Sequence, residues 1–265
     1  MRCGLALLAM LAACAPASVA GPSPSDAGLP ATRLRIAAAA DLRFALDDIV
    51  AAWKSANPSA EVEVVYGSSG NLFAQIRQGA PYGVFFSADV AYPRRLEEAG
   101  SGGSGGTRLY AIGQIVLWTR SDSSLDVSSR GLRALTDPAV QTVSIANPEH
   151  APYGRAAMAA LASAGIDKLV RPKLVLGENV SQAAQFVESG SADAGLIALA
   201  LALSPPLEGA GHYFVVPLDS YPPIEQGVLV LDSALEAGLA HAFADFVLGM
   251  DGRAVLDRHG FLPPP

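Results

Sequence analysis

Short apolar runs alternate with segments of helical periodicity along most of the chain. Residues 34–39 form an apolar run that predicts a strand, and apolar positions at helical spacing between 42 and 53 predict a helix that ends before Pro58. Further runs with the length and composition of buried strands follow at 62–66, 84–86, 115–118, 143–146, 174–176 and 196–199. Strands that alternate with helices in this way are typical of parallel sheets covered by helices, so the sequence predicts an α/β fold.

The first 20 residues have the pattern of an export signal. Arg2 precedes an apolar run over 5–13 that is too short to span a bilayer, and small residues follow the run. Two processing sites fit the pattern: cleavage after Ala20, or cleavage before Cys14, whose preceding residues resemble a lipoprotein box. Residues 21–32 are rich in Pro, Ala, Ser and Gly and predict a flexible linker. We therefore expect a periplasmic protein, either free or anchored by a lipid on Cys14.

Composition narrows the classes of protein to which the chain can belong. Its 265 residues are 51% hydrophobic and 16% charged, which excludes a disordered chain or a coiled coil and allows one or two compact domains. The net charge of −7 argues against nucleic-acid binding, which needs clustered Lys and Arg. The only cysteines are Cys3 and Cys14, so the chain after the signal has no disulfide and no thiolate metal site.

Small and polar residues follow three of the predicted strands, at the point where each strand ends. They are Ala40 and Asp41 after the first strand, 67–70 after the second, and 87–89 after the third. The carboxyl ends of parallel strands meet at one edge of a sheet, and the unpaired N–H groups of helix N-termini attract anions. Three such turns together favour an anion site, although Ser, Asp and Asn are also ordinary helix N-caps.

Other kinds of site find little support in the sequence. Residues 67–70 lack the lysine and the spacing of a phosphate-binding P-loop, and the four histidines lack metal-ligand spacing. A G-x-S-x-G match at Ser104 lies in a Gly- and Ser-rich stretch, without the strand and helix that flank a hydrolase nucleophile. A serine hydrolase that uses Ser69 or Ser104 is the alternative from a different class, but no histidine, His150 included, is visibly paired with a serine. We therefore expect no metal site, no cofactor and no enzymatic activity.

Six motifs resemble the periplasmic molybdate-binding proteins. They are IAAAADL at 36–42, GSSG at 67–70, QIRQGAPYGVFFSAD at 75–89, NPEHAPYG at 147–154, GENV at 177–180 and HGF at 259–261. The likeness extends over nearly all of 34–262. It implies the two-lobed periplasmic-binding-protein fold (type II), in which two α/β lobes, each with a mainly parallel sheet, enclose a ligand cleft. The boundaries that it implies are 33–112 with 218–265 for lobe I, and 113–217 for lobe II.

The resemblance also implies a function and a binding site. Proteins of this family capture molybdate or tungstate and deliver it to the permease of an ABC importer, and we expect this chain to act in the same way as a monomer. The oxyanion is held by uncharged donors rather than by direct metal ligands; carried over by position, its contacts are Ala40, Asp41, Ser69, Ala88, Tyr153 and Val180. A pocket of donors alone satisfies a buried dianion without an arginine and disfavours a ligand that carries a proton.

Two positions depart from the family pattern. Many relatives have a serine at the first turn, where this chain has Ala40 and the carboxylate of Asp41. We expect Asp41 to point away from the ligand and to N-cap the following helix; the alternative is that it accepts a hydrogen bond from a protonated oxyanion such as phosphate. Ala198 occupies a position where some relatives have a tyrosine, and we expect the hydroxyl of Tyr153 to replace the missing donor.

Overall fold

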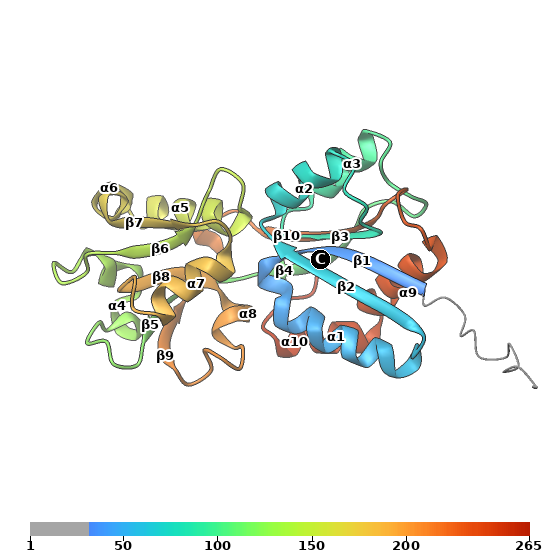
Figure 1. The fold of residues 1–265 in the computed structure, drawn as a ribbon. Helices are drawn as coiled ribbons and strands as arrows, with labels where there is room; N and C mark the ends of the chain where they lie inside the picture. Colours follow the sequence, from blue (N-terminus) through green and yellow to red (C-terminus); the bar gives the residue numbers. More distant parts are fainter. Residues whose placement is uncertain (1–31) are drawn as a thin grey trace, which may run out of the picture. The chain divides into compact units, whose positions relative to one another are not determined.

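The structure is a computed structural model that describes residues 32–265. The predicted export signal, both of its processing sites, Cys14 and all but the last residue of the predicted linker lie outside the described residues. Among the residues that are described, no helix combines the length and the apolar character needed to cross a membrane. Two five-stranded sheets, each covered by helices, organise this part of the chain (Figure 1).

The first sheet and its helices form lobe I. The strand order is β2-β1-β3-β10-β4, and the strands are β1 (Thr32–Ala39), β2 (Ala60–Gly67), β3 (Val84–Ser87), β4 (Arg108–Gly113) and β10 (Ile224–Val230). The helices are α1 (Arg43–Ala56), α2 (Ser69–Arg77), α3 (Ala91–Glu98), α9 (Ala237–Leu248) and α10 (Met250–Arg258), and a 3₁₀ turn, η1 (Ala40–Leu42), connects β1 to α1. The periodic apolar positions of α1 are buried, as their spacing predicts, and Trp53 packs edge-on against Phe243 of α9.

The second sheet and its helices form lobe II. The strand order is β7-β6-β8-β5-β9, and the strands are β5 (Ile115–Arg120), β6 (Val143–Ala146), β7 (Leu174–Gly177), β8 (Ala194–Ala198) and β9 (Gly211–Val215). The helices are α4 (Val127–Arg130), α5 (Pro152–Ser163), α6 (Asp167–Val170), α7 (Val180–Glu188) and α8 (Leu199–Ala202), and the 3₁₀ turns are η2 (Gly131–Thr136), η3 (Arg171–Lys173) and η4 (Leu218–Ser220). The chain crosses from lobe I to lobe II between β4 and β5 and returns between β9 and β10.

The two helix-covered sheets confirm the predicted two-lobed α/β fold, and each sheet is mixed, with antiparallel as well as parallel pairs. In lobe I, β1 pairs in parallel with β2 and β3, whereas β10 pairs antiparallel with β3 and β4. Lobe II repeats the pattern, with β6 parallel to β7 and β8, and with β5 antiparallel to β8 and β9. The antiparallel strands are next to the two crossings between the lobes. The alternation of strands and helices in a sequence indicates local βαβ units. It does not indicate the direction of a strand that returns to the sheet from the other lobe.

The parallel strands bring their carboxyl ends to one edge of each sheet. In lobe I, Ala39 at the end of β1 lies beside Gly67 at the end of β2. In lobe II, Ala146 at the end of β6 lies beside Gly177 at the end of β7. Each of these strands is followed by a helix that begins within a few residues, so both lobes present helix N-termini at these edges.

Candidate anion-binding site

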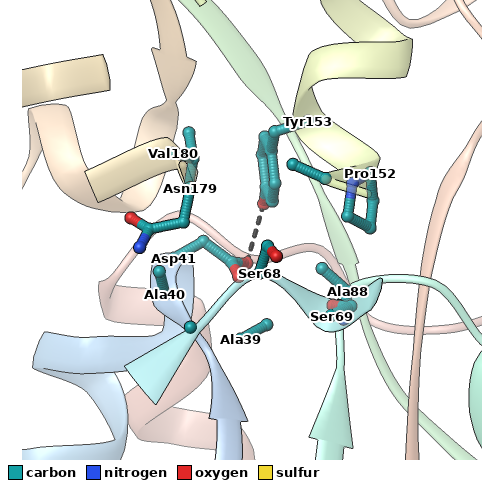
Figure 2. A pocket seen from close by; sticks show the side chains of 12 residues that line it. Ala39, Ala40, Asp41, Ser68, Ser69, Ala88, Pro152, Tyr153, Asn179 and Val180 are labelled. Carbon is teal, nitrogen blue, oxygen red and sulfur yellow. Dashed lines mark hydrogen bonds between the residues drawn. The ribbon is translucent and has the colours of Figure 1, made fainter. Parts of the chain in front are cut away.

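A small cavity lies where the strand ends of lobe I meet those of lobe II. Its volume is about 10 Å³, which is the space of roughly one water-sized site. Figure 2 shows the lining side chains, which come from both lobes: Ala39, Ala40, Asp41, Gly67, Ser68, Ser69, Ala88, Ala151, Pro152, Tyr153, Asn179 and Val180. All six residues that the resemblance carries over are among them. None of the lining residues is Lys or Arg, and Asp41 is the one carboxylate.

Three helices begin at the cavity. Ser69 is the first residue of α2, Val180 is the first residue of α7, and Tyr153 follows Pro152 in the first turn of α5. Amides in the first turn of a helix have no acceptor within the helix, and the aligned peptide dipoles place partial positive charge there. The cavity therefore faces backbone N–H groups from both lobes, which is the arrangement that binds oxyanions at helix N-termini.

The first turn of α5 includes Tyr153. The helix begins at Pro152, whose fixed φ suits the first helical position and whose missing N–H is not needed there. This start places the Tyr153 amide, as well as its ring, at the cavity.

Ser69 and Ala88 are linked on the lobe I side of the cavity. The Ala88 amide donates to Ser69 Oγ at 2.9 Å, and both residues are buried. The resemblance implies that this amide contacts the oxyanion, but in the structure it is bonded to the serine. Because Oγ accepts from Ala88, the Ser69 hydroxyl proton is available to an acceptor in the cavity. Ala88 thus orients the Ser69 side chain, and the Ser69 hydroxyl can donate a hydrogen bond into the cavity.

Ser68 joins the two lobes beside this pair. It N-caps α2 by accepting from the Asn71 amide, and its Oγ lies 2.9 Å from His150 Nδ1 in lobe II. The Gly70 amide donates to the His150 carbonyl at 2.9 Å. A Cβ on Gly70 would lie 2.6 Å from that carbonyl oxygen, so this close contact between the lobes requires glycine. This pairing is not visible in the sequence, because the partners are 82 residues apart in the chain.

Asp41 does not cap a helix, so that expectation was wrong. Asp41 lies inside η1, and no side chain caps η1 or α1. Its side chain is 1% exposed, and its Oδ2 accepts from the Tyr153 hydroxyl at 2.9 Å and from Gln226 Nε2 at 2.7 Å (Figure 2). The extra 3₁₀ turn places Asp41 within the first turn rather than before it, and its carboxylate is bonded to Tyr153 of lobe II and Gln226 of lobe I, while the amides of Asp41 and Leu42 also lower its pKa.

Gln226 of β10 donates to the same carboxylate oxygen as Tyr153. Tyr110 of β4 donates its hydroxyl to Gln226 Oε1 at 2.5 Å, which leaves the Gln226 amide group to donate to Asp41 and to the Tyr153 oxygen. Gln226 and Tyr110 are both buried. The sequence analysis missed these two residues. The available signal was a glutamine that precedes the apolar run of this strand, because a buried amide requires hydrogen-bond partners.

Burial changes the titration of this group of residues. Burial raises the pKa of Asp41 to about 6, although the hydrogen bonds from Gln226 and Tyr153 lower it. Burial, followed by the charge of Asp41, raises the pKa of Tyr153 and of Tyr110 well above the ordinary range, so both hydroxyls remain donors. Asp41 Oδ1 is buried and has no hydrogen-bond partner in the described chain.

The Tyr153 hydroxyl donates its hydrogen bond to Asp41. From the sequence we expect this hydroxyl to replace the donor that is missing at Ala198, whereas the structure bonds it to Oδ2 of the carboxylate. Its buried ring lines the cavity. Ala198, the other position that departs from the family pattern, ends β8, is fully buried and is not among the lining residues.

Further contacts join the lobes around the cavity. Ser181 Oγ of α7 donates to the Ala40 carbonyl at 2.9 Å. Arg155 of α5 forms an ion pair with Asp89, which follows β3. This pair lies outside the cavity lining and is partly exposed. The charge of the guanidinium is therefore balanced by Asp89 and is not directed at the cavity.

Serine–histidine contacts bear on the hydrolase alternative. Ser104 Oγ lies 3.1 Å from His241 Nε2, in addition to the contact between Ser68 and His150. Over residues 32–265, neither imidazole is hydrogen-bonded to a carboxylate, and Ser104 lies in an exposed turn rather than between a strand and a helix. Nucleophilic catalysis by a triad requires that third group, so these contacts do not favour a hydrolase.

Comparison with known proteins agrees with this architecture. A family model described as bacterial extracellular solute-binding protein matches residues 34–262. The molybdate-binding protein ModA of Rhodobacter capsulatus is 34% identical over 76% of this chain and 77% of its own length. ModA of Azotobacter vinelandii is 32% identical over 87% of this chain and 90% of its own length.

A solved structure extends the likeness to three dimensions. The periplasmic molybdate-binding protein of Azotobacter vinelandii aligns with a TM-score of 0.81 and 30% identity, covering 88% of this chain and all of that one. Its two-lobed periplasmic-binding-protein fold is the fold described above. This chain belongs to the bacterial extracellular solute-binding protein family, together with the molybdate-binding proteins ModA.

Proposed function

We propose that this protein captures molybdate or tungstate outside the cytoplasm and delivers the ion to an ABC importer. The observation that carries the proposal is the convergence of the N-termini of α2, α5 and α7, with the Ser69 hydroxyl, on one small buried cavity without Lys or Arg. Two relatives that are matched over most of their length, at 34% and 32% identity, are named molybdate-binding proteins. The ligand contacts in this proposal are Ala40, Asp41, Ser69, Ala88, Tyr153 and Val180, with Ala88 acting through Ser69.

The chemistry of the cavity favours a small, fully deprotonated oxyanion. Oriented N–H and O–H groups stabilise a buried dianion because they replace its water of hydration without adding a charge that must itself be desolvated. Molybdate and tungstate carry no proton near neutral pH, whereas phosphate does.

The contacts between the lobes support a transport role. Ser68 with His150, Ser181 with Ala40 and Arg155 with Asp89 connect the two lobes in this structure. A ligand that bridges both lobes shifts the population toward a closed form, which a permease can recognise. We propose that the protein acts as a monomer without a cofactor and is not an enzyme, and that it is periplasmic, with or without a lipid on Cys14.

Titration calorimetry on protein that begins near Ala31 tests the proposal. The ligands are molybdate, tungstate, sulfate and phosphate at about pH 6. We expect molybdate and tungstate to bind at least about tenfold more tightly than the other two ions, a difference of about 1.4 kcal/mol or more. Phosphate binding far tighter than molybdate binding would overturn the assignment of the ligand.

A second candidate ligand is a protonated oxyanion such as phosphate. The observation that favours it is the unpartnered Oδ1 of Asp41, which can accept a hydrogen bond from a ligand hydroxyl. The same calorimetric series separates the two candidates, because phosphate is then the tightest of the four ligands.

A further inference from the structure

Asp41 lines the cavity, and one of its two carboxylate oxygens has no hydrogen-bond partner in the described chain. Its Oδ2 accepts two hydrogen bonds, from Tyr153 and Gln226, while Oδ1 has no partner although it is buried. Asp41 is a lining residue, and Figure 2 shows its carboxylate among the other lining side chains, with Tyr153 bonded to it. A buried polar oxygen without a partner is uncommon in folded proteins and indicates a missing ligand atom or proton.

A carboxylate in this place conflicts with the proposed dianion. Two like charges in a buried site cannot both remain ionised without a large free-energy penalty. The other polar groups that the cavity offers are donors, namely the Ser69 hydroxyl and the amides at the starts of α2, α5 and α7. Asp41 is the exception, and it is a donor only in its protonated form.

We propose that Asp41 takes up one proton when the oxyanion binds, and that the resulting Oδ1–H group donates a hydrogen bond to a ligand oxygen. The proposal rests on the proposed function and deepens it. The proton comes from solvent, the O–H bond at Oδ1 is the only covalent bond formed, and the ligand remains a dianion. Oδ2 remains the acceptor for Tyr153 and Gln226, so the existing hydrogen bonds are kept in both protonation states.

Within residues 32–265, no cationic side chain faces the carboxylate and could neutralise it in place of a proton. The groups that face it are the Tyr153 hydroxyl from α5 and the Gln226 amide from β10, with Tyr110 of β4 behind them. Arg43, two residues along the chain, places its guanidinium over the Tyr66 ring at 4.7 Å. His150, from the loop before α5, is bonded to Ser68.

The titration of the ligand-free site agrees with this geometry. Burial raises the pKa of Asp41 to about 6, so near neutral pH the group is ionised but needs little free energy to take up a proton. A dianion placed beside it raises the pKa further. The protonated site is then composed of donors only, which selects against a ligand with its own hydroxyl hydrogen.

Calorimetry in pairs of buffers with different ionisation enthalpies tests the proposal, because protons taken up by the protein are released by the buffer. For molybdate at about pH 8 we expect uptake of about one proton per ion. We also expect the affinity to fall by about tenfold for each pH unit above about 6.5, as linkage to one proton requires. Binding heat that is the same in all buffers, with an affinity that does not change with pH, would overturn the inference.

The variant Asp41→Asn imitates the protonated carboxyl, because its amide oxygen can accept from Tyr153 and Gln226 while its NH₂ group faces the ligand. We expect it to bind molybdate without proton uptake, to lose the pH dependence, and at about pH 8 to bind more tightly than the wild type. Asp47→Asn is the matched control on the same side of lobe I; Asp47 accepts from Tyr66 outside the cavity. It should keep the wild-type pH dependence, and loss of that dependence in the control would contradict the assignment to Asp41.

Failure of the inference and failure of the proposed function give different results. Molybdate binding without proton uptake contradicts the inference alone. Absence of binding for all four oxyanions at every pH, in protein whose circular dichroism shows it to be folded, contradicts the proposed function and the inference together. The proton-uptake measurement uses the wild-type protein, so it decides the inference even if Asp41→Asn does not fold.

Discussion

The wall of the cavity that contains Ser69 differs from the wall that contains Asp41 in how its polar atoms are satisfied. On the first wall, the Ala88 amide donates to Ser69 Oγ, and the serine proton is left for a ligand. On the second wall, Tyr153 and Gln226 donate to Asp41 Oδ2, and an acceptor, Oδ1, is left over. We call these the serine wall and the aspartate wall.

The difference shows that one cavity can combine a fixed donor with a group whose role depends on its proton. The serine wall offers a donor at every pH near neutrality, because a hydroxyl does not titrate there. The aspartate wall offers an acceptor when Asp41 is ionised and a donor when it is protonated. The serine wall therefore favours a dianion at every pH near neutrality. The aspartate wall favours a dianion only when Asp41 is protonated.

The largest expected effect concerns the stability of the ligand-free protein. Burial raises the pKa of Asp41 from 3.8 to about 6, so the folded state holds a proton that the unfolded chain releases as the pH rises between these values. The wild type therefore loses stability as the pH rises through this window, by about 3 kcal/mol at about 1.4 kcal/mol per pKa unit. Asp41→Asn avoids this loss, and urea unfolding at about pH 4 and pH 7 should show its stability relative to the wild type increasing by that amount.

Asp193 gives a control of opposite sign for this measurement. Burial raises the pKa of Asp193, but hydrogen bonds from Thr142 and Gln141 outweigh burial and hold the pKa below its ordinary value. Asp193 therefore stabilises the fold above its ordinary pKa and loses this effect as the pH falls. Asp193→Asn should lose stability relative to the wild type as the pH rises. If the difference in unfolding free energy between Asp41→Asn and the wild type does not change with pH, burial does not raise the pKa of Asp41.

Ser69→Ala breaks the serine wall. It removes a donor to a charged ligand and leaves the Ala88 amide without its acceptor, so we expect molybdate binding to weaken by about 1.5–3 kcal/mol, roughly 10- to 100-fold in Kd. Calorimetry at about pH 6 measures the change. Ser144→Ala is the control, because Ser144 is also buried and donates to the Ala183 carbonyl away from the cavity. Equal weakening in both variants would mean that Ser69 acts through general stability.

The smallest expected effect distinguishes two roles for Tyr153. If its hydroxyl serves Asp41, Tyr153→Phe removes an interaction that lowers the Asp41 pKa. Binding should then begin to weaken at a pH higher by up to about 1 unit, with the affinity at low pH unchanged. A loss of about 1–2 kcal/mol at every pH would instead show that the hydroxyl contacts the oxyanion directly. Tyr221→Phe, which alters a hydroxyl bonded to the Ile115 amide, should leave the pH profile in place.

The sequence predicted much of the fold because the signals of β1, β2, β3 and their helices are local. Apolar runs ended where the strands end, and the turns at 40–41, 67–70 and 87–89 supply residues of the cavity. The antiparallel strands were missed because their direction is set by two crossings between the lobes. Periodicity in a sequence describes neighbours along the chain and does not describe partners that come from another lobe.

The aspartate wall could not be derived for the same reason. The partners of Asp41 are 112 and 185 residues away in the chain, so no local pattern relates Tyr153 or Gln226 to it. A local rule, that an Asp before a helix is its cap, favoured the wrong orientation. The serine wall was easier to predict, because Ser69 and Ala88 follow β2 and β3, the two parallel strands on either side of β1, and lie in motifs of the family.

A crystal structure of the protein with molybdate, with the ion located by the anomalous scattering of molybdenum, tests the central claim most directly. We expect the ion between Ser69 Oγ and the Val180 amide, with Asp41 Oδ1 within a short O–H···O distance of about 2.5–2.7 Å from one of its oxygens. An ion bound outside the cavity, or an Asp41 carboxylate turned away from a bound ion, would contradict this account.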